Sequence, residues 1–268
     1  MTSKDDSANG TTPSWPEVDT ISSKWPLYLD PPQTIYTALK PSIDLIVAAC
    51  LLPILLPFIA IAWVLTKLSS RGPGFYVQSR SGFGGRPYHI VKIRSMKSDE
   101  ATARDINWAK QGDSRITRIG TVLRALHLDE LPQVFNVLRG EMSLVGPRPE
   151  RPEVIASKGL NDEVPGYALR MQARPGVTGL AQVQLPPDSD IVGVRHKVCY
   201  DLYYLANQSL WLDIRICAAT VLKAFLSPAQ LQKFLFLPSR ECVCEQFLAW
   251  LQPGYVEQDS TATPATIV

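Results

Sequence analysis

Cysteine and histidine are scarce in this sequence, and their scatter excludes two kinds of site. The 268 residues include five cysteines and three histidines, with no Cys-x-x-C pair among them. A disulfide framework needs an even set of cysteines at suitable spacings, and a structural zinc site needs clustered Cys and His ligands. We therefore expect reduced thiols in a cytoplasmic setting, with neither disulfide bonds nor zinc.

Charge is also sparse, at 19% of residues and a net +2, but positive charge gathers after the most apolar segment. Between residues 67 and 118, eleven Lys or Arg stand against four Asp or Glu. Basic residues beside a membrane segment mark its cytoplasmic side and attract anionic lipid. A nucleic-acid patch would not usually adjoin a hydrophobic anchor, so we expect membrane lipids and no nucleic acid as partners.

Residues 1–35 lack apolar periodicity and are rich in Ser, Thr, Pro and Asp, which predicts a flexible tail. They also lack the charged and apolar regions of a secretory signal.

Residues 45–65 follow without a single charge over 21 positions, which is long enough to span a bilayer. Pro53 and Pro57 each remove a backbone hydrogen bond near the middle and bend the helix. If Lys40 and Lys67 both stay on the cytoplasmic side, the segment must enter and leave by one face. Proline is tolerated in spanning helices, so these residues alone slightly favour a spanning helix over a re-entrant one.

Two adjacent carboxylates, Asp129 and Glu130, begin the most informative stretch of the chain. The apolar residues after them have the i, i+3, i+4, i+7 spacing of one buried helical face: Leu131, Val134, Phe135 and Leu138. We expect Asp129 to be the N-cap of this helix, with Pro132 in the first turn, where its missing N–H costs nothing. The free N–H groups there should help to keep Asp129 ionised, and they also suit a phosphate.

Arg124 and Arg148 flank the carboxylate pair, and a Gly-Pro-Arg-Pro turn at 146–149 closes the stretch. Carboxylates for a metal or a nucleophile, beside arginines for phosphate oxygens, suggest phosphoryl transfer. Ordinary capping is the simpler interpretation of an isolated Asp–Glu pair, and the pair alone favours it. A glycosidase is disfavoured, because its carboxylates must face each other across the scissile bond.

Elsewhere the patterns predict short elements. Strands at 75–78 and 87–93 on either side of a glycine-rich turn predict a hairpin. Short helices are expected over 120–127 and 153–158. Residues 198–224 carry the apolar faces of amphipathic helices, which pack on a core or lie at a membrane surface. For Trp211 in that segment, buried core and lipid interface both stay open.

Several motifs together resemble the bacterial sugar transferase family, the monotopic phosphoglycosyl transferases of exopolysaccharide, O-antigen and glycoprotein pathways. Leu-Asp-Glu-Leu-Pro-Gln lies at 128–133, and Val-Leu-Arg-Gly-Glu-Met-Ser-Leu-Val-Gly-Pro-Arg-Pro-Glu at 137–150. Lys-Ile-Arg-Ser-Met at 92–96 and Arg-Pro-Gly-Val-Thr-Gly-Leu at 174–180 match two further segments. The motifs occur in the family's order across roughly residues 38–226.

The resemblance implies a fold. This is a small mixed α/β domain with an N-terminal re-entrant membrane helix hairpin and amphipathic surface helices. Pro57 matches the proline at the family's helix break, although Leu56 replaces the serine often found before it. The chain would comprise a flexible tail, the membrane hairpin, a catalytic domain and a C-terminal extension, at residues 1–35, 36–70, 71–227 and 228–268.

The resemblance also implies a reaction. A sugar-1-phosphate passes from a nucleotide diphospho-sugar, usually a UDP-sugar, to a polyprenyl phosphate such as undecaprenyl phosphate, and UMP is released. Asp129 would be the nucleophile that forms a covalent phosphosugar intermediate, and Glu130 with Asp129 would hold Mg²⁺. The implied phosphate-binding residues are Lys92, Arg94, Arg124, Arg148 and Asp201. Simple helix capping is the alternative for Asp201.

The implied location is the bacterial inner membrane, with the catalytic domain on its cytoplasmic face. The sequence departs from many relatives at 184–188, where Gln-Leu-Pro-Pro-Asp replaces Asn-Gly-Arg-Asn. The donor preference therefore does not carry over. This departure is the one support for an alternative function, a catalytically silent membrane-anchored scaffold, and the intact carboxylate pair speaks against it. A homo-oligomer stays open.

Overall fold

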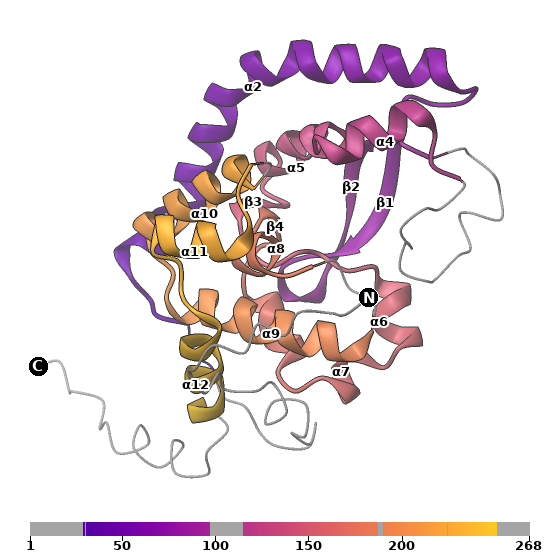
Figure 1. Ribbon diagram of the computed structural model, residues 1–268. Coiled ribbons are helices and arrows are strands. Elements are labelled where there is room, and N and C mark those ends of the chain that lie inside the picture. Colours follow the sequence, from indigo (N-terminus) through magenta and orange to yellow (C-terminus); the bar gives the residue numbers. More distant parts are fainter. Residues whose placement is uncertain (1–28, 30, 97–114, 187–189, 224, 251–268) are drawn as a thin grey trace, which may run out of the picture.

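The computed structural model describes residues 29, 31–96, 115–186, 190–223 and 225–250, which form a mixed helical and β structure (Figure 1). The predicted tail lies almost wholly outside these residues, as does the end of the C-terminal extension. Figure 1 shows a long helix over the top, a β-hairpin with short helices in the middle, and α9 along the bottom. The helices of eight or more residues are α2 (Ile35–Ser69), α4 (Arg118–Ala125), α9 (Ile191–Ala206), α10 (Leu210–Leu222), α11 (Pro228–Leu235) and α12 (Arg240–Trp250).

The predicted hairpin is confirmed. Strand β1 (Phe75–Ser81) pairs antiparallel with β2 (Pro87–Ile93), in a register from Phe75 opposite Ile93 to Ser81 opposite Pro87. The first strand runs further than the sequence predicts, so the turn is shorter. Gly84 and Gly85 adopt left-handed backbone conformations there, with φ of 62° and 73°, which glycine reaches without strain. The hairpin carries Lys92 towards the middle of the molecule.

A second sheet, with a strand the sequence did not reveal, joins two motifs. Strand β3 (Ser143–Val145) pairs in parallel with β4 (Gly176–Thr178). The backbone of β4 passes very close to the residue that follows β3. A Cβ added at Gly176 would lie only 2.1 Å from the Gly146 nitrogen. Glycine is therefore required, and the contact fixes the 146–149 turn beside the Arg-Pro-Gly segment.

Two hydrophobic cores support this arrangement. One joins α9 and α10 to the C-terminal helices, and its largest buried side chains include Tyr204, Leu205, Ile216, Leu231 and Phe247. Residues past 227 thus pack into the same core as the α9–α10 pair. The other core lies between the hairpin, α5 (Val134–Leu138) and α2, and contains Ile90, Ile93, Val137, Met142 and Ile59. It holds the membrane helix against the hairpin strand that carries Lys92.

Helix α2 contains the predicted membrane segment. It is apolar enough to cross a membrane, and only 17% of its most apolar window is buried. A straight helix of 35 residues would be about 52 Å long, well beyond a bilayer core of about 30 Å. Figure 1 shows instead that α2 bends into two arms, and Pro53 and Pro57 lie inside it. A bent helix could cross the membrane or return to the side it entered from, so the re-entrant hairpin stays a prediction.

The predicted helices of residues 198–224 are α9 and α10. Trp211 on α10 is 65% exposed, which excludes the buried-core alternative. Leu210, Ile214 and Val221 are exposed on the same helix. The predicted helices at 120–127 and 153–158 are also found, as α4 and as α6 (Pro152–Ser157).

Candidate active site

The carboxylate pair lies in the first turn of a 3₁₀ helix, η2 (Leu128–Gln133), just inside its start. The residue before this helix is His127, in a left-handed conformation with φ of 53°. The prediction that Asp129 is the N-cap is therefore wrong. The expected single helix is also divided, because α5 begins only at Val134. Its four apolar positions are nevertheless buried or half-buried and pack in the hairpin core.

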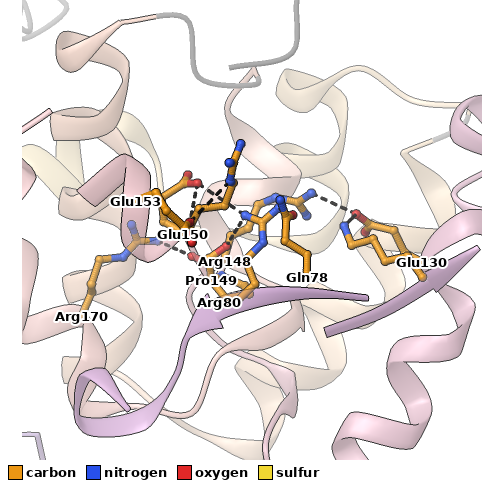
Figure 2. Close-up of polar contacts among 10 residues, drawn as sticks. Gln78, Arg80, Glu130, Arg148, Pro149, Glu150, Glu153 and Arg170 are labelled. Carbon is orange, nitrogen blue, oxygen red and sulfur yellow. Dashed lines mark hydrogen bonds and ion pairs between the residues drawn. The ribbon is translucent and has the colours of Figure 1, made fainter. Parts of the chain in front are cut away.

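Glu130 accepts hydrogen bonds from two cations on separate segments. Its Oε1 lies 2.7 Å from Lys92 Nζ on β2 and 2.9 Å from Arg148 Nη2 after β3. Figure 2 shows Arg148 directed at Glu130 from across the site. Burial alone would raise the pKa of Glu130, but the charges of Arg148 and Lys92 outweigh it and hold this pKa well below its usual range. Glu130 is thus a fixed anion.

Asp129 differs from its neighbour. It is only 8% exposed, and its carboxylate forms no hydrogen bond or ion pair with the residues that the structure describes. Burial raises the pKa of Asp129, and the negative charge of Glu130 raises it further, against the opposing charges of Lys92 and Arg124. The expectation that a helix start would favour the ionised form is therefore wrong. The result is an unpaired carboxylate of increased basicity.

Arg124 and Arg94 are held by polar groups on the hairpin side. Arg124 Nε donates to Ser95 Oγ at 2.8 Å, which orients the α4 side chain. Arg94 donates to the carbonyl oxygens of Arg71 and Ser70, at 2.7 and 2.8 Å. Arg94 thus ties the end of β2 to the residues that follow the membrane helix, and these contacts do not bring it to Glu130.

The turn that carries Arg148 is clamped from β1. Arg80 Nη1 donates to the Pro149 carbonyl oxygen at 3.1 Å and lies 3.4 Å from Glu150 Oε1 (Figure 2). The Ser81 amide donates to the Glu150 carbonyl oxygen at 2.9 Å. These contacts limit the positions open to the Arg148 side chain.

The same turn is held on its other side by Arg170 from η3 (Tyr167–Gln172). Arg170 Nη2 donates to the Arg148 carbonyl oxygen at 2.9 Å (Figure 2). It also pairs with Asp201 at 2.6 Å. Asp201 lies well inside α9, so the capping alternative is wrong. Its contact is with Arg170, not with the Lys92–Glu130–Arg148 cluster. Sequence reasoning missed Arg170 and Arg80, and neither has a local signal that could have revealed it.

The site residues could bind a metal ion only together with a substrate that supplies further ligands. Among the described residues, no group of three or more His, Cys, Asp or Glu could hold a metal. Mg²⁺, however, is often bound by one or two carboxylates together with substrate phosphates. Asp129 and the remaining oxygen of Glu130 could supply such ligands, so the site suits a cation shared with a diphosphate.

The chain is similar to known proteins over the residues that form this site. The family described as bacterial sugar transferase matches residues 35–227. A UDP-glucose:undecaprenyl-phosphate glucose-1-phosphate transferase of Caulobacter vibrioides is 43% identical over 68% of this chain and 68% of its own length. A UDP-N-acetylgalactosamine-undecaprenyl-phosphate N-acetylgalactosaminephosphotransferase of Aeromonas hydrophila is 41% identical over 71% of this chain.

That match spans only 44% of the Aeromonas protein. The exopolysaccharide production protein PSS of Rhizobium leguminosarum bv. phaseoli is matched over 93% of its length, at 39% identity and 68% of this chain. The residues that the family model matches include the hairpin, the carboxylate pair and the Gly-Pro-Arg-Pro turn. The chain therefore belongs to the bacterial sugar transferase family.

Proposed function

We propose that this protein transfers a sugar-1-phosphate from a UDP-sugar to undecaprenyl phosphate, forming an undecaprenyl-diphosphate sugar and UMP. The names of the similar proteins support this reaction class, although two of them differ in the sugar. The observation that carries the proposal is the contrast within the carboxylate pair. Glu130 is bound by two cations, while Asp129 beside it is unpaired.

In this reaction Asp129 is the nucleophile. Its carboxylate attacks the phosphorus that bears the sugar, the bond to the UMP oxygen breaks, and an aspartyl phosphosugar forms. A phosphate oxygen of undecaprenyl phosphate then attacks the same phosphorus, and the Asp129 carboxylate is released. Covalent catalysis of this kind divides one displacement into two easier steps. The raised pKa of Asp129 supports this role, because the more basic carboxylate donates its electrons more readily.

The cations around the pair stabilise the phosphate oxygens. Lys92 and Arg148 neutralise Glu130 in the free protein and remain close enough to contact a bound diphosphate. Arg124 contributes positive charge near Asp129. Mg²⁺ held by Glu130 and Asp129 would supply further neutralisation of the diphosphate. In this proposal Arg94, Arg170 and Asp201 are positioning residues, because their described contacts are within the protein.

The membrane helix explains how one soluble and one lipid substrate meet. We propose that α2 is re-entrant, with Pro57 at its break and with both ends on the cytoplasmic side of the bacterial inner membrane. The bend in Figure 1, the proline positions and the basic residues after α2 support this path. The exposed apolar faces of α2 and α10 would then contact lipid. This arrangement would place the Glu130 cluster near the headgroups, where the acceptor phosphate lies.

A panel of nucleotide sugars tests the proposal. The full chain, in detergent or nanodiscs, is incubated with each sugar in the presence of undecaprenyl phosphate, and nucleoside monophosphate is measured. At least one UDP-sugar should yield UMP with wild-type protein and none with Asp129→Asn. Release from no donor in the panel would instead favour the silent scaffold.

A further inference from the structure

A cavity lies beside the start of α2, apart from the Glu130 cluster. Its volume is about 480 Å³, within the range of small-molecule sites. Lys92, Glu130 and Arg148 are not among its lining residues. The lining residues that matter here are Thr37, Lys40, Asp44, Ser143, Arg174 and Tyr204.

One wall of this cavity is a buried polar network. Lys40 Nζ lies 3.4 Å from Asp44 Oδ2 and also pairs with Asp213 of α10. Ser143 donates to Asp44, and the Tyr204 hydroxyl lies 2.8 Å from Asp213 Oδ1. Lys40 therefore faces two carboxylates, and the network keeps one more negative than positive charge. The wall is a fixed polar surface, and it attaches the first arm of α2 to α9, α10 and β3.

Arg174 adds a positive charge that makes no contact with the network. It is half-buried and lines the cavity, and its guanidinium has no hydrogen bond or ion pair with another described residue. The planar fork of arginine matches two oxygens of a phosphate. Arg174 is thus available to bind an oxyanion in the cavity.

Exposed apolar side chains border part of the cavity. Phe83 lines it and is 56% exposed, and Ile35 on α2 is 82% exposed. The exposed apolar surface of the membrane segment begins shortly after, at Leu45 and Ile46. A polar interior with an apolar rim, at the start of a membrane helix, suits a molecule with a phosphate headgroup and hydrocarbon chains.

We propose that this cavity binds the phosphate of an anionic glycerophospholipid. Arg174 pairs with the phosphate, and the acyl chains follow the exposed face of α2. A lipid bound in this way holds the first arm of α2 at headgroup depth. The site is separate from the proposed donor site, and the inference does not depend on the sugar transfer reaction.

Binding of short-chain lipid to the full chain in a neutral detergent tests this site. Dihexanoyl phosphatidylglycerol should bind the wild type, and Arg174→Gln should weaken binding by about tenfold or more, the effect of losing one charge-assisted hydrogen bond. Arg86→Gln is the matched control. It removes the same charge from an exposed position on the hairpin turn and should leave binding unchanged.

A second pair of variants keeps the test decisive if Arg174→Gln folds poorly. Ala38→Trp fills the cavity from an exposed lining position, whereas Leu39→Trp adds the same ring at a neighbour that does not line it. Binding should be lost in the first and kept in the second. Equal binding by both, or equal affinity for dihexanoyl phosphatidylcholine, would overturn the proposal. If inorganic phosphate binds as tightly as the lipid, the lipid assignment is overturned in favour of a free-anion site.

Discussion

Arg170 joins Asp201 to the turn that carries Arg148. Its guanidinium lies 2.6 Å from the Asp201 carboxylate and donates to the Arg148 carbonyl oxygen at 2.9 Å. Asp201 is only 2% exposed, and the Arg170 side chain is 9% exposed. A residue of α9 thus fixes a backbone position at the Glu130 cluster without contacting that cluster.

Removing both members of this pair should destabilise the protein by less than the two single changes added together. Asp201→Asn removes the carboxylate that faces the buried Arg170 charge, which should cost about 3 kcal/mol of the free energy of unfolding. Asp201→Asn combined with Arg170→Gln should lose clearly less than the sum of the two single changes. Denaturant unfolding of the four proteins measures the coupling. Additive losses would mean that the pair does not act as a unit.

The second prediction concerns the metal. If Glu130 and Asp129 bind a cation together with the donor diphosphate, EDTA should abolish UMP release and Mg²⁺ should restore it. Activity is measured in the same preparation before chelation, after it and after Mg²⁺ is added back. Full activity in metal-free buffer would contradict the metal role of Glu130.

The third prediction concerns the path of α2. If the helix is re-entrant, Ser22→Cys and Ser157→Cys should both resist a membrane-impermeant thiol reagent in intact cells, on a background without native cysteines. Both should react after permeabilisation. Labelling of Ser22→Cys alone in intact cells would show a spanning helix. Replacing Pro53 and Pro57 by leucine should shift the protein towards that spanning pattern, because the bend is removed.

Local sequence signals predicted the hairpin, and they singled out Asp129 and Glu130 as candidate site residues. Strand residues and a glycine-rich turn are adjacent in the chain, and so are Asp129 and Glu130. The family motifs implied that Lys92, Arg148 and Glu130 belong to one site, but the convergence of the two cations on Glu130 was not predicted. It could not be derived from spacing, because it depends on η2 and on the β3–β4 pair. Strand β3 is only three residues long and has little periodicity to detect.

The remaining errors have physical causes. The N-cap prediction for Asp129 failed because His127 takes the left-handed conformation and the 3₁₀ helix begins earlier than expected. Its ionisation was misjudged because burial and the charge of Glu130 are tertiary effects. Arg80 and Arg170 were missed because their partners are distant in sequence, at Pro149, Glu150 and Asp201.

The fourth prediction follows from the pKa of Asp129. Attack requires the ionised carboxylate, and its pKa lies above the usual aspartate value of about 4. Formation of the phosphosugar adduct should therefore rise with pH through that raised pKa. Glu130→Gln removes a neighbouring negative charge and frees Lys92 and Arg148, so it should shift this acid limb to lower pH. The rate of adduct formation against pH measures the shift. If the acid limb of Glu130→Gln stays at the same pH or moves to higher pH, the proposed effect of Glu130 on the pKa of Asp129 is contradicted.

The most direct test of the central claim is the intact mass of the protein after incubation with a UDP-sugar alone. The wild type should gain the mass of a sugar phosphate and release UMP without any lipid acceptor. Asp129→Asn should form no adduct, whereas Glu130→Gln should still form it slowly. If Asp129→Asn is modified and Glu130→Gln is not, the nucleophile has been assigned to the wrong carboxylate. If the wild type forms no adduct and releases UMP only when undecaprenyl phosphate is added, direct transfer replaces the covalent mechanism.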